Sequence, residues 1–325
     1  MGDGLVASPL GNSYMTPLMK ILTREQEELN FKAKMTQIQF TSLAKRLNKP
    51  ALLREMASLR NFTEFEKSPT CVMSEVKKWL INGWNTEYLL RINALKLEED
   101  ALRNSLQWAF PQAYYSVFTI CLAFFKVAGF TELSHNAVMS KVGKLMAEAK
   151  YPLSISFLAN GGKERIYLNI TKNDLPSTIH FNDTPEVIDS QICQFLNSTR
   201  EMELEEKKQK FKLTTKGGKR KTHYSEADWE AVSKSIGFTS VINLLYRKRI
   251  KSNYRDIETY LCEELDPDIV YRDLIRITSS INLVHEAFIV NALGELEFSS
   301  FYKKLCPEII DVVSNRQKNI AKIIA

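Results

Sequence analysis

Apolar residues in the first third of the chain recur at the spacing of helices. Residues 17–110 are therefore expected to be helical, with a helix start at Pro50 and a break at the Ser68-Pro69 pair. Residues three and four positions apart lie on one face of a helix, so the periodic positions predict an apolar stripe that faces a core. The stripe comprises Tyr88, Ile92, Leu95, Leu102 and Leu106.

The most apolar segment is the run AYYSVFTICLAFFKVAGF, residues 113–130. It is shorter than the roughly 20 residues that a bilayer span needs, and it contains Lys126. It therefore predicts a buried core helix and no membrane segment. Pro111 is expected at the start of this helix, where its missing N–H costs little, and Gly129 at its end. Ser134 is a candidate N-cap for the next helix.

The pattern changes after residue 150. Residues 154–158 and 165–170 are rich in β-branched and aromatic side chains, and Asn160-Gly161-Gly162 lies between them. Asparagine and glycine tolerate the positive φ of tight turns, so the segment predicts a β hairpin. A third short strand is expected at residues 178–181. Residues 151–185 are accordingly predicted to form a small β insertion in a helical protein.

Helix signals return after the insertion. Ser225 with Asp228 resembles a capping box. A long helical stretch is predicted for residues 239–264, and the Asp266-Pro267 pair is typical of the start of a further helix. A break is expected near Pro307, before the last helix.

Composition and cysteine content agree with a helical globular protein. The chain has 325 residues, a net charge of +6 and 25% charged residues, which is ordinary for a globular protein. The excess of positive charge permits an acidic or nucleic-acid partner without requiring one. The five cysteines include no CxxC pair, so neither a disulfide framework nor a zinc site is expected. Reduced thiols, and residues 1–16 without the order of a signal peptide, predict a cytoplasmic protein.

A charged run at residues 200–224 is the clearest local feature. Four glutamates come first, and a series of basic residues follows around Gly217-Gly218. The run can be a solvated helix end followed by a mobile loop, or a loop that contacts phosphates of a nucleic acid. The basic residues are Lys207, Lys208, Lys210, Lys212, Lys216, Lys219, Arg220 and Lys221.

Motifs of metal and phosphate chemistry are missing from the sequence. The four histidines are widely separated, and His285-Glu286 fails as a zinc-protease motif because Ile289 stands where the second histidine would be. His285 is therefore interpreted as a hydrogen-bonded core residue, and Cys121 as an inert core thiol. No phosphate-binding loop, dinucleotide fingerprint or GxSxG motif is present, and no cofactor or metal is expected.

Two segments together resemble the HEPN superfamily of helical domains, particularly the small bacterial members paired with nucleotidyltransferases. Residues 112–145 contain AYYSVF, an apolar helix, a turn and SHNAVMSKVGKL. Family members have a similar AYYA-F helix and a turn before a TH or SH that opens the next helix. Residues 245–260 read LYRKRIKSNYRDIETY, and similar family segments carry an arginine, an Asp or Asn, a tyrosine and an aspartate. Those positions are Arg249, Asn253, Tyr254 and Asp256 here.

The resemblance implies a four- to five-helix bundle over residues 85–300 with an insertion at 151–224. Residues 1–84 would form a helical extension, and residues 301–325 a C-terminal helix. A generic helical bundle is the alternative. Catalytic HEPN members cut RNA with an arginine followed by a histidine after four to six residues. Tyr254 occupies that histidine position relative to Arg249. A tyrosine titrates near pH 10 and is a poor base at neutral pH.

Three functions remain open from the sequence. The first is a non-catalytic HEPN-like module that binds RNA or a protein partner, or pairs as a homodimer, in a bacterial toxin–antitoxin or phage-defence system. Its RNA contacts would be the basic run together with Arg249, Lys251 and Arg255. The second is a ribonuclease with a degenerate site formed by Arg249, Asn253, Tyr254 and Asp256. The third is a structural subunit of a larger complex.

Overall fold

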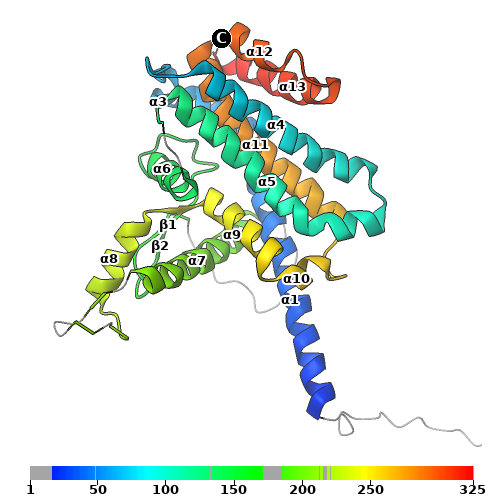
Figure 1. Ribbon diagram of the computed structural model, residues 1–325, viewed down its shortest axis with the longest axis vertical. Coiled ribbons are helices and arrows are strands. Elements are labelled where there is room, and N and C mark those ends of the chain that lie inside the picture. The colour runs from blue at the N-terminus through cyan, green and yellow to red at the C-terminus, as the bar shows by residue number, and fades with distance from the viewer. Residues whose placement is uncertain are drawn as a thin grey trace, which may run out of the picture.

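The computed structural model describes residues 17–47, 49–131, 134–170, 184–211, 213–214, 218–219 and 221–324. These residues form thirteen helices and one small sheet of three strands (Figure 1). The prediction of a mainly α-helical fold with a small β element is confirmed.

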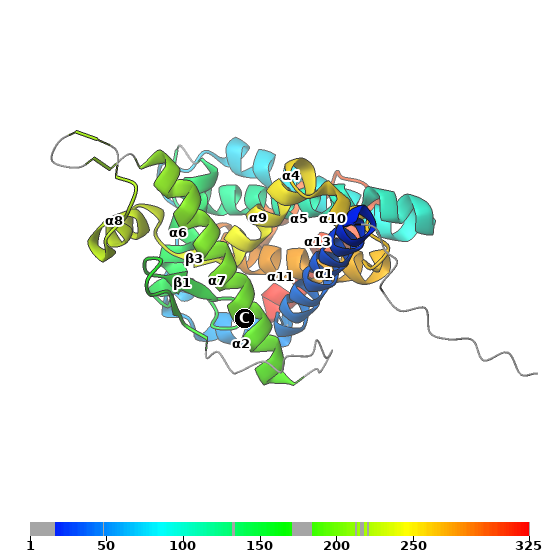
Figure 2. The ribbon, with the colours of Figure 1, turned by 90° about the horizontal axis from the view of Figure 1, so that it is seen from below.

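Three long helices form the centre of the bundle: α4 (Met73–Lys96), α5 (Glu99–Val127) and α11 (Pro267–Leu293) lie side by side (Figure 1). Helix α9 (Val241–Tyr254) packs on α5, and the short α10 (Ile257–Leu261) follows it. Helix α1 (Pro17–Arg46) packs against α11 and against α7 (Pro185–Lys210). Seen from below, α1 and α7 lie on the same side of the bundle (Figure 2).

One buried apolar cluster extends from α1 to the last helix. Phe40 of α1, for example, packs edge-on against Phe110 of α5 and Phe195 of α7, with ring centroids 5.1 and 5.8 Å apart. Aromatic pairs of this geometry add to the free energy gained by burial. The cluster includes residues on both sides of positions 84 and 300. The domain boundaries predicted at these positions stay a prediction.

The apolar run is confirmed as a core helix. Its residues from Ala113 to Val127 belong to α5, and almost all of them are buried. No helix in the described part of the chain combines the length and apolar character that crossing a membrane requires.

The predicted helix start at Pro111 is wrong, because Pro111 lies inside α5. A proline in a helix interior loses one backbone hydrogen bond and costs about 3 kcal/mol. Leu106 and Phe110 before it and Ala113 and Tyr114 after it are all buried in the same core. Burial on both sides of the proline offsets the lost bond and keeps the helix continuous.

Most predicted helix ends are confirmed. The break at Ser68-Pro69 lies between α3 and α4, the Ser134 hydroxyl accepts a hydrogen bond from the Ala137 N–H, and Ser225 and Asp228 form a capping box. The remaining helices are α2 (Lys49–Ser58), α3 (Arg60–Thr63), α6 (His135–Ala147), α8 (Glu226–Ile236), α12 (Glu295–Tyr302) and α13 (Pro307–Ile324).

The predicted single apolar stripe is wrong in part. Its residues belong to two helices, since α4 ends at Lys96 and α5 begins at Glu99. Leu95, in the last turn of α4, is 79% exposed. The change of direction between the two helices separates positions that share one face only in a continuous helix.

The predicted hairpin is confirmed with shorter strands. Strand β1 (Leu158–Asn160) pairs antiparallel with β2 (Tyr167–Leu168), so Asn160 belongs to a strand and not to the turn. Strand β3 (Thr239–Ser240) pairs with the other edge of β1, in the order β2-β1-β3. The strand expected at residues 178–181 lies outside the described residues.

The prediction of one helix over residues 239–264 is wrong. Its first two residues form β3, and the chain leaves helical geometry again between α9 and α10, at Arg255 and Asp256. Ser240 and Asn243 form a capping box that begins α9 directly after the strand. The backbone N–H of Ser240 donates to the Asn243 side chain at 3.0 Å. This local bond turns the chain from sheet into helix.

Arg200 attaches the sheet to the bundle. This side chain of α7 is fully buried. Its guanidinium donates to the carbonyl oxygens of Gly161 (3.1 Å) and Gly237 (2.7 Å) and to the hydroxyl of Ser233 (2.7 Å). Burial lowers the pKa of Arg200. One side chain therefore holds the hairpin, the end of α8 and the approach to β3 together.

Candidate nucleic-acid interface

Helix α9 presents basic and aromatic side chains on two faces. Tyr246 and Arg249 point toward α5 and α6, where both contact aromatic rings. Arg247 and Lys248 contact α7 and α1 instead. Positions three and four apart share a face of a helix, whereas adjacent positions diverge. The sequence YRKRIK therefore sends basic side chains in opposite directions.

Arg249 is held by tyrosines. Its Nη2 donates to the Tyr115 hydroxyl, and its guanidinium carbon lies 4.9 Å from the Tyr115 ring, 5.6 Å from the Tyr246 ring and 5.8 Å from the Tyr114 ring. Aromatic faces attract a cation. The Nε atom is buried without a hydrogen-bond partner, and no carboxylate in the described chain pairs with Arg249. The positive charge is thus oriented without being neutralised.

His135 completes this cluster. It is the first residue of α6, its Nδ1 lies 2.7 Å from the Tyr114 hydroxyl, and its ring stacks on Phe118 with centroids 4.1 Å apart. Burial first, and then the charge of Arg249, lower the pKa of His135. The imidazole is therefore neutral at neutral pH. We call Tyr114, Tyr115, His135, Tyr246 and Arg249 the arginine–aromatic cluster.

Comparison with known protein families, with curated proteins and with solved structures found no match. The HEPN resemblance therefore rests on the two sequence segments at 112–145 and 245–260. The structure packs these segments against each other, since the arginine–aromatic cluster takes three residues from the first and two from the second. His135 was not predicted to join Arg249, although both belong to segments that carry the resemblance.

The predicted constellation of Arg249, Asn253, Tyr254 and Asp256 is not gathered in one place. Tyr254 is 69% exposed, and the Asp256 carboxylate accepts a hydrogen bond from Lys251 at 2.7 Å on the other face of α9. Within the described chain, neither residue forms a hydrogen bond or ion pair with Arg249. The role of these four residues as a site stays a prediction.

Four of the predicted RNA-contacting cations have an acidic partner. Lysines 207, 208 and 210 lie in the last turn of α7, and Lys219 is exposed. Lys212, Lys216 and Arg220 are outside the described residues. The ion pairs are Lys208 with Glu205, Lys221 with Asp228, Lys251 with Asp256 and Arg255 with Glu206. Among the described residues, Lys207 and Lys210 have no carboxylate partner.

A cavity of about 220 Å³ connects these lysines to the arginine–aromatic cluster. Lys207 and Lys210 line it from α7, Asn136 from α6, and Asn243 and Tyr246 from α9. Tyr246 belongs both to the cavity wall and to the arginine–aromatic cluster. We call this cavity, together with the exposed edge of the cluster, the aromatic–basic groove.

The two glutamates of the groove do not neutralise its lysines. Glu206 is paired with Arg255 at 2.8 Å. Glu203 is half-buried and accepts hydrogen bonds from the Thr239 hydroxyl and from the Asn243 amide. Burial raises the pKa of Glu203, which favours its neutral form. The groove therefore offers positive charge beside aromatic rings.

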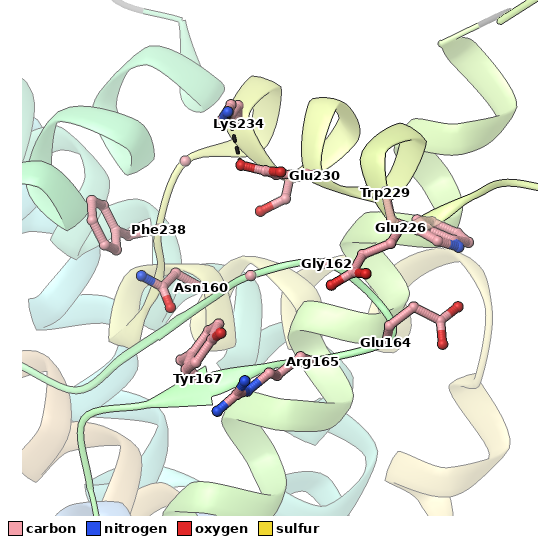
Figure 3. A pocket seen from close by; sticks show the side chains of 13 residues that line it. Asn160, Gly162, Glu164, Arg165, Tyr167, Glu226, Trp229, Glu230, Lys234 and Phe238 are labelled. Carbon is pink, nitrogen blue, oxygen red and sulfur yellow. Dashed lines mark ion pairs between the residues drawn. The ribbon is translucent and has the colours of Figure 1, made fainter.

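A second cavity, of about 560 Å³, lies between the β1–β2 hairpin and α8 (Figure 3). Its charges are mixed: Glu230 pairs with Lys234 at 2.8 Å, and the Arg165 guanidinium lies 4.9 Å from the Tyr167 ring. The Trp229 ring packs on Tyr224 with centroids 5.3 Å apart. Glu164 and Glu226 also line this cavity, so acidic side chains outnumber basic ones among its lining residues, unlike in the groove.

Proposed function

We propose that this protein is a non-catalytic RNA-binding module in which the aromatic–basic groove takes a single-stranded segment. The observation that carries the proposal is the position of Tyr246. It joins the arginine–aromatic cluster to the cavity that Lys207 and Lys210 line. The proposal agrees with the resemblance to HEPN domains, for which a bacterial toxin–antitoxin or phage-defence assembly is the implied setting.

The groove provides the two interactions that single-stranded nucleic acids use. Lysines attract the phosphate backbone, and the counterions released on binding make the affinity depend on salt. Aromatic rings and an arginine plane stack on unpaired bases. His135 and Tyr246 are half-buried, and Tyr246 also lines the cavity.

The arrangement gives little support to cleavage. The residue at the position of the family's catalytic histidine is Tyr254, which is exposed and, among the described residues, forms no hydrogen bond with Arg249. His135 has one ring nitrogen committed to the Tyr114 hydroxyl. We therefore infer binding without a reaction, and no cofactor or metal is part of the proposal.

Exchanging Lys207 and Lys210 together for glutamine is expected to weaken the binding of single-stranded RNA. Because the variant neutralises two fewer phosphates, the plot of log affinity against log salt should become shallower by about 1.4. The affinity at moderate salt should fall on the order of tenfold. Fluorescence anisotropy with a labelled RNA, repeated over a salt series, measures both quantities, and a denaturing gel reports the length of the RNA.

The matched control is Lys303→Gln with Lys304→Gln, which removes the same charge from exposed residues after α12, at the far end of the bundle (Figure 1). Equal slopes for both double variants would show that binding follows net charge and not the groove. RNA that shortens with the native protein, but not with Arg249→Ala, would establish a ribonuclease. If the native protein does not bind RNA at low salt, the RNA proposal is wrong and a protein-docking subunit remains.

A further inference from the structure

The opposite face of α9 borders a separate cavity of about 220 Å³, between α1, α9 and α10. Its wall contains four basic side chains and one acidic side chain. These are Lys32 from α1, Arg247, Lys248 and Lys251 from α9, and Asp256 from the turn before α10. Phe31 and Met35 add apolar surface. We call this cavity the basic pocket.

Lys248 is buried without a direct ion-pair partner among the described residues. Its side chain is 7% exposed, and its ammonium donates to the Thr36 hydroxyl at 2.9 Å and lies 5.2 Å from the Phe195 ring. Burial, and then the neighbouring charges of Arg247 and Lys251, hold the pKa of Lys248 well below its usual value. A buried ammonium with three donors is costly unless an anion accepts from it.

Arg247, the residue before Lys248, also has no carboxylate partner among the described residues. Its Nη1 donates to the hydroxyls of Ser198 (2.7 Å) and Thr199 (2.8 Å), and its Nε is buried without a partner. Burial lowers the pKa of Arg247 as well. These two adjacent basic groups are thus positioned by hydroxyl groups and not by carboxylates.

The other charges of the wall are already occupied. Lys251 pairs with Asp256 at 2.7 Å, and Lys32 pairs with Glu28 at 2.8 Å. The only acid of the described wall is therefore committed, while Arg247 and Lys248 are not. Thr36, Thr259 and Gln39 add neutral polar groups. The pocket has an excess of donors over acceptors and room for a small anion.

We propose that the basic pocket binds the terminal phosphate of a phosphate monoester, held by Arg247 and Lys248. A phosphate dianion offers three oxygens that can accept from a guanidinium fork and an ammonium together. Such a group exists on small phosphorylated molecules and at the 5′ end of RNA. The site is independent of the aromatic–basic groove, because it lies on the other face of α9.

Titration calorimetry with inorganic phosphate tests the site itself. The native protein should give saturable binding in the millimolar range or tighter. Lys248→Met, which keeps the length of the side chain and removes the charge, should weaken it about tenfold or more. Lys318→Met, on the exposed side of α13, is the matched control and should bind phosphate like the native protein. Circular dichroism checks that each variant folds, and Arg247→Gln replaces Lys248→Met if the latter does not.

Two further ligands identify the source of the phosphate. If the pocket takes an RNA end, 5′-phosphorylated RNA should bind more tightly than the 5′-hydroxyl form, and Lys248→Met should abolish the difference. If it takes a small molecule, ribose 5-phosphate should bind at least as well as phosphate, and the two RNA forms should bind alike. Failure of the native protein to bind phosphate, or equal binding by Lys248→Met, overturns the inference. RNA binding that persists in that case leaves the proposed function standing.

Discussion

Replacing Arg316 by methionine is expected to lower the free energy of unfolding by about 3–5 kcal/mol. Arg316 of α13 is 4% exposed and lies between two buried carboxylates. Its Nη1 donates to Glu87 of α4 at 2.8 Å, and its Nε and Nη2 donate to Glu286 of α11 at 2.7 and 2.6 Å. The charge of Arg316 helps to hold the pKa of Glu87 at about 2. Without the guanidinium, two acids would face each other in the core.

Urea unfolding followed by circular dichroism measures this loss. Arg60→Met is the matched control: it removes an ion pair with Glu64 of similar length, 2.8 Å, from a side chain that is 86% exposed. An exposed pair contributes less than about 1 kcal/mol. Adding Glu286→Gln to Arg316→Met should recover part of the stability, since one of the opposed charges is removed. Equal losses for Arg316→Met and Arg60→Met would contradict a buried ionic connection between α4, α11 and α13.

Lowering the pH from about 6.5 to about 4 is expected to destabilise the protein by about 3 kcal/mol through His285 alone. This histidine is fully buried, as predicted from the sequence. Its Nδ1 lies 2.9 Å from the Ile281 carbonyl oxygen, and its Nε2 lies 3.0 Å from the Tyr151 hydroxyl. Burial lowers the pKa of His285 from 6.5 to about 4.

The loss of stability at low pH follows from proton uptake by the unfolded chain. Above pH 6.5 the imidazole is neutral in both states, so its contribution is fully present. Between pH 6.5 and 4 only the unfolded chain takes up the proton, which favours unfolding, and below pH 4 both states are protonated. Urea unfolding at several pH values across this window, compared between the native protein and His285→Gln, isolates the contribution. His223→Gln, at an exposed residue, should leave the pH dependence unchanged. Parallel curves for the native protein and His285→Gln would refute the assignment.

Features set by neighbouring residues could be read from the sequence. Ser134, the Ser225–Asp228 box and the Asp266-Pro267 pair cap helices as predicted, because each needs contacts only within one turn. The buried helix after residue 113 was predictable from its unbroken apolar composition. The hairpin was predictable because its tight turn needs a residue that tolerates positive φ, and glycine does so. Gly161 indeed has a φ of 88°.

Features that depend on distant contacts could not be predicted. Pro111 stays inside α5 because the core buries both sides of it, and Thr239 joins a strand because β1 lies beside it. The sequence shows Arg247, Lys248 and Arg249 as three adjacent basic residues. Their separation into an aromatic cluster and a buried pocket depends on which helices pack against each face of α9. The pairing of His135 with Arg249 likewise requires the packing of α5, α6 and α9.

The hydrogen bond between Thr36 and Lys248 joins residues 212 positions apart in the chain. Contacts between such distant segments require closure of a long loop and tend to slow folding. During synthesis, the polar residues of α1 therefore cannot contact α9 until most of the chain has been made. A recombinant fragment that starts after residue 84 contains every residue of the arginine–aromatic cluster, but it lacks the first part of α4 and the α1 wall beside Lys248. Such a fragment would therefore retain the side chains on one face of α9 while it loses part of the basic pocket on the other face.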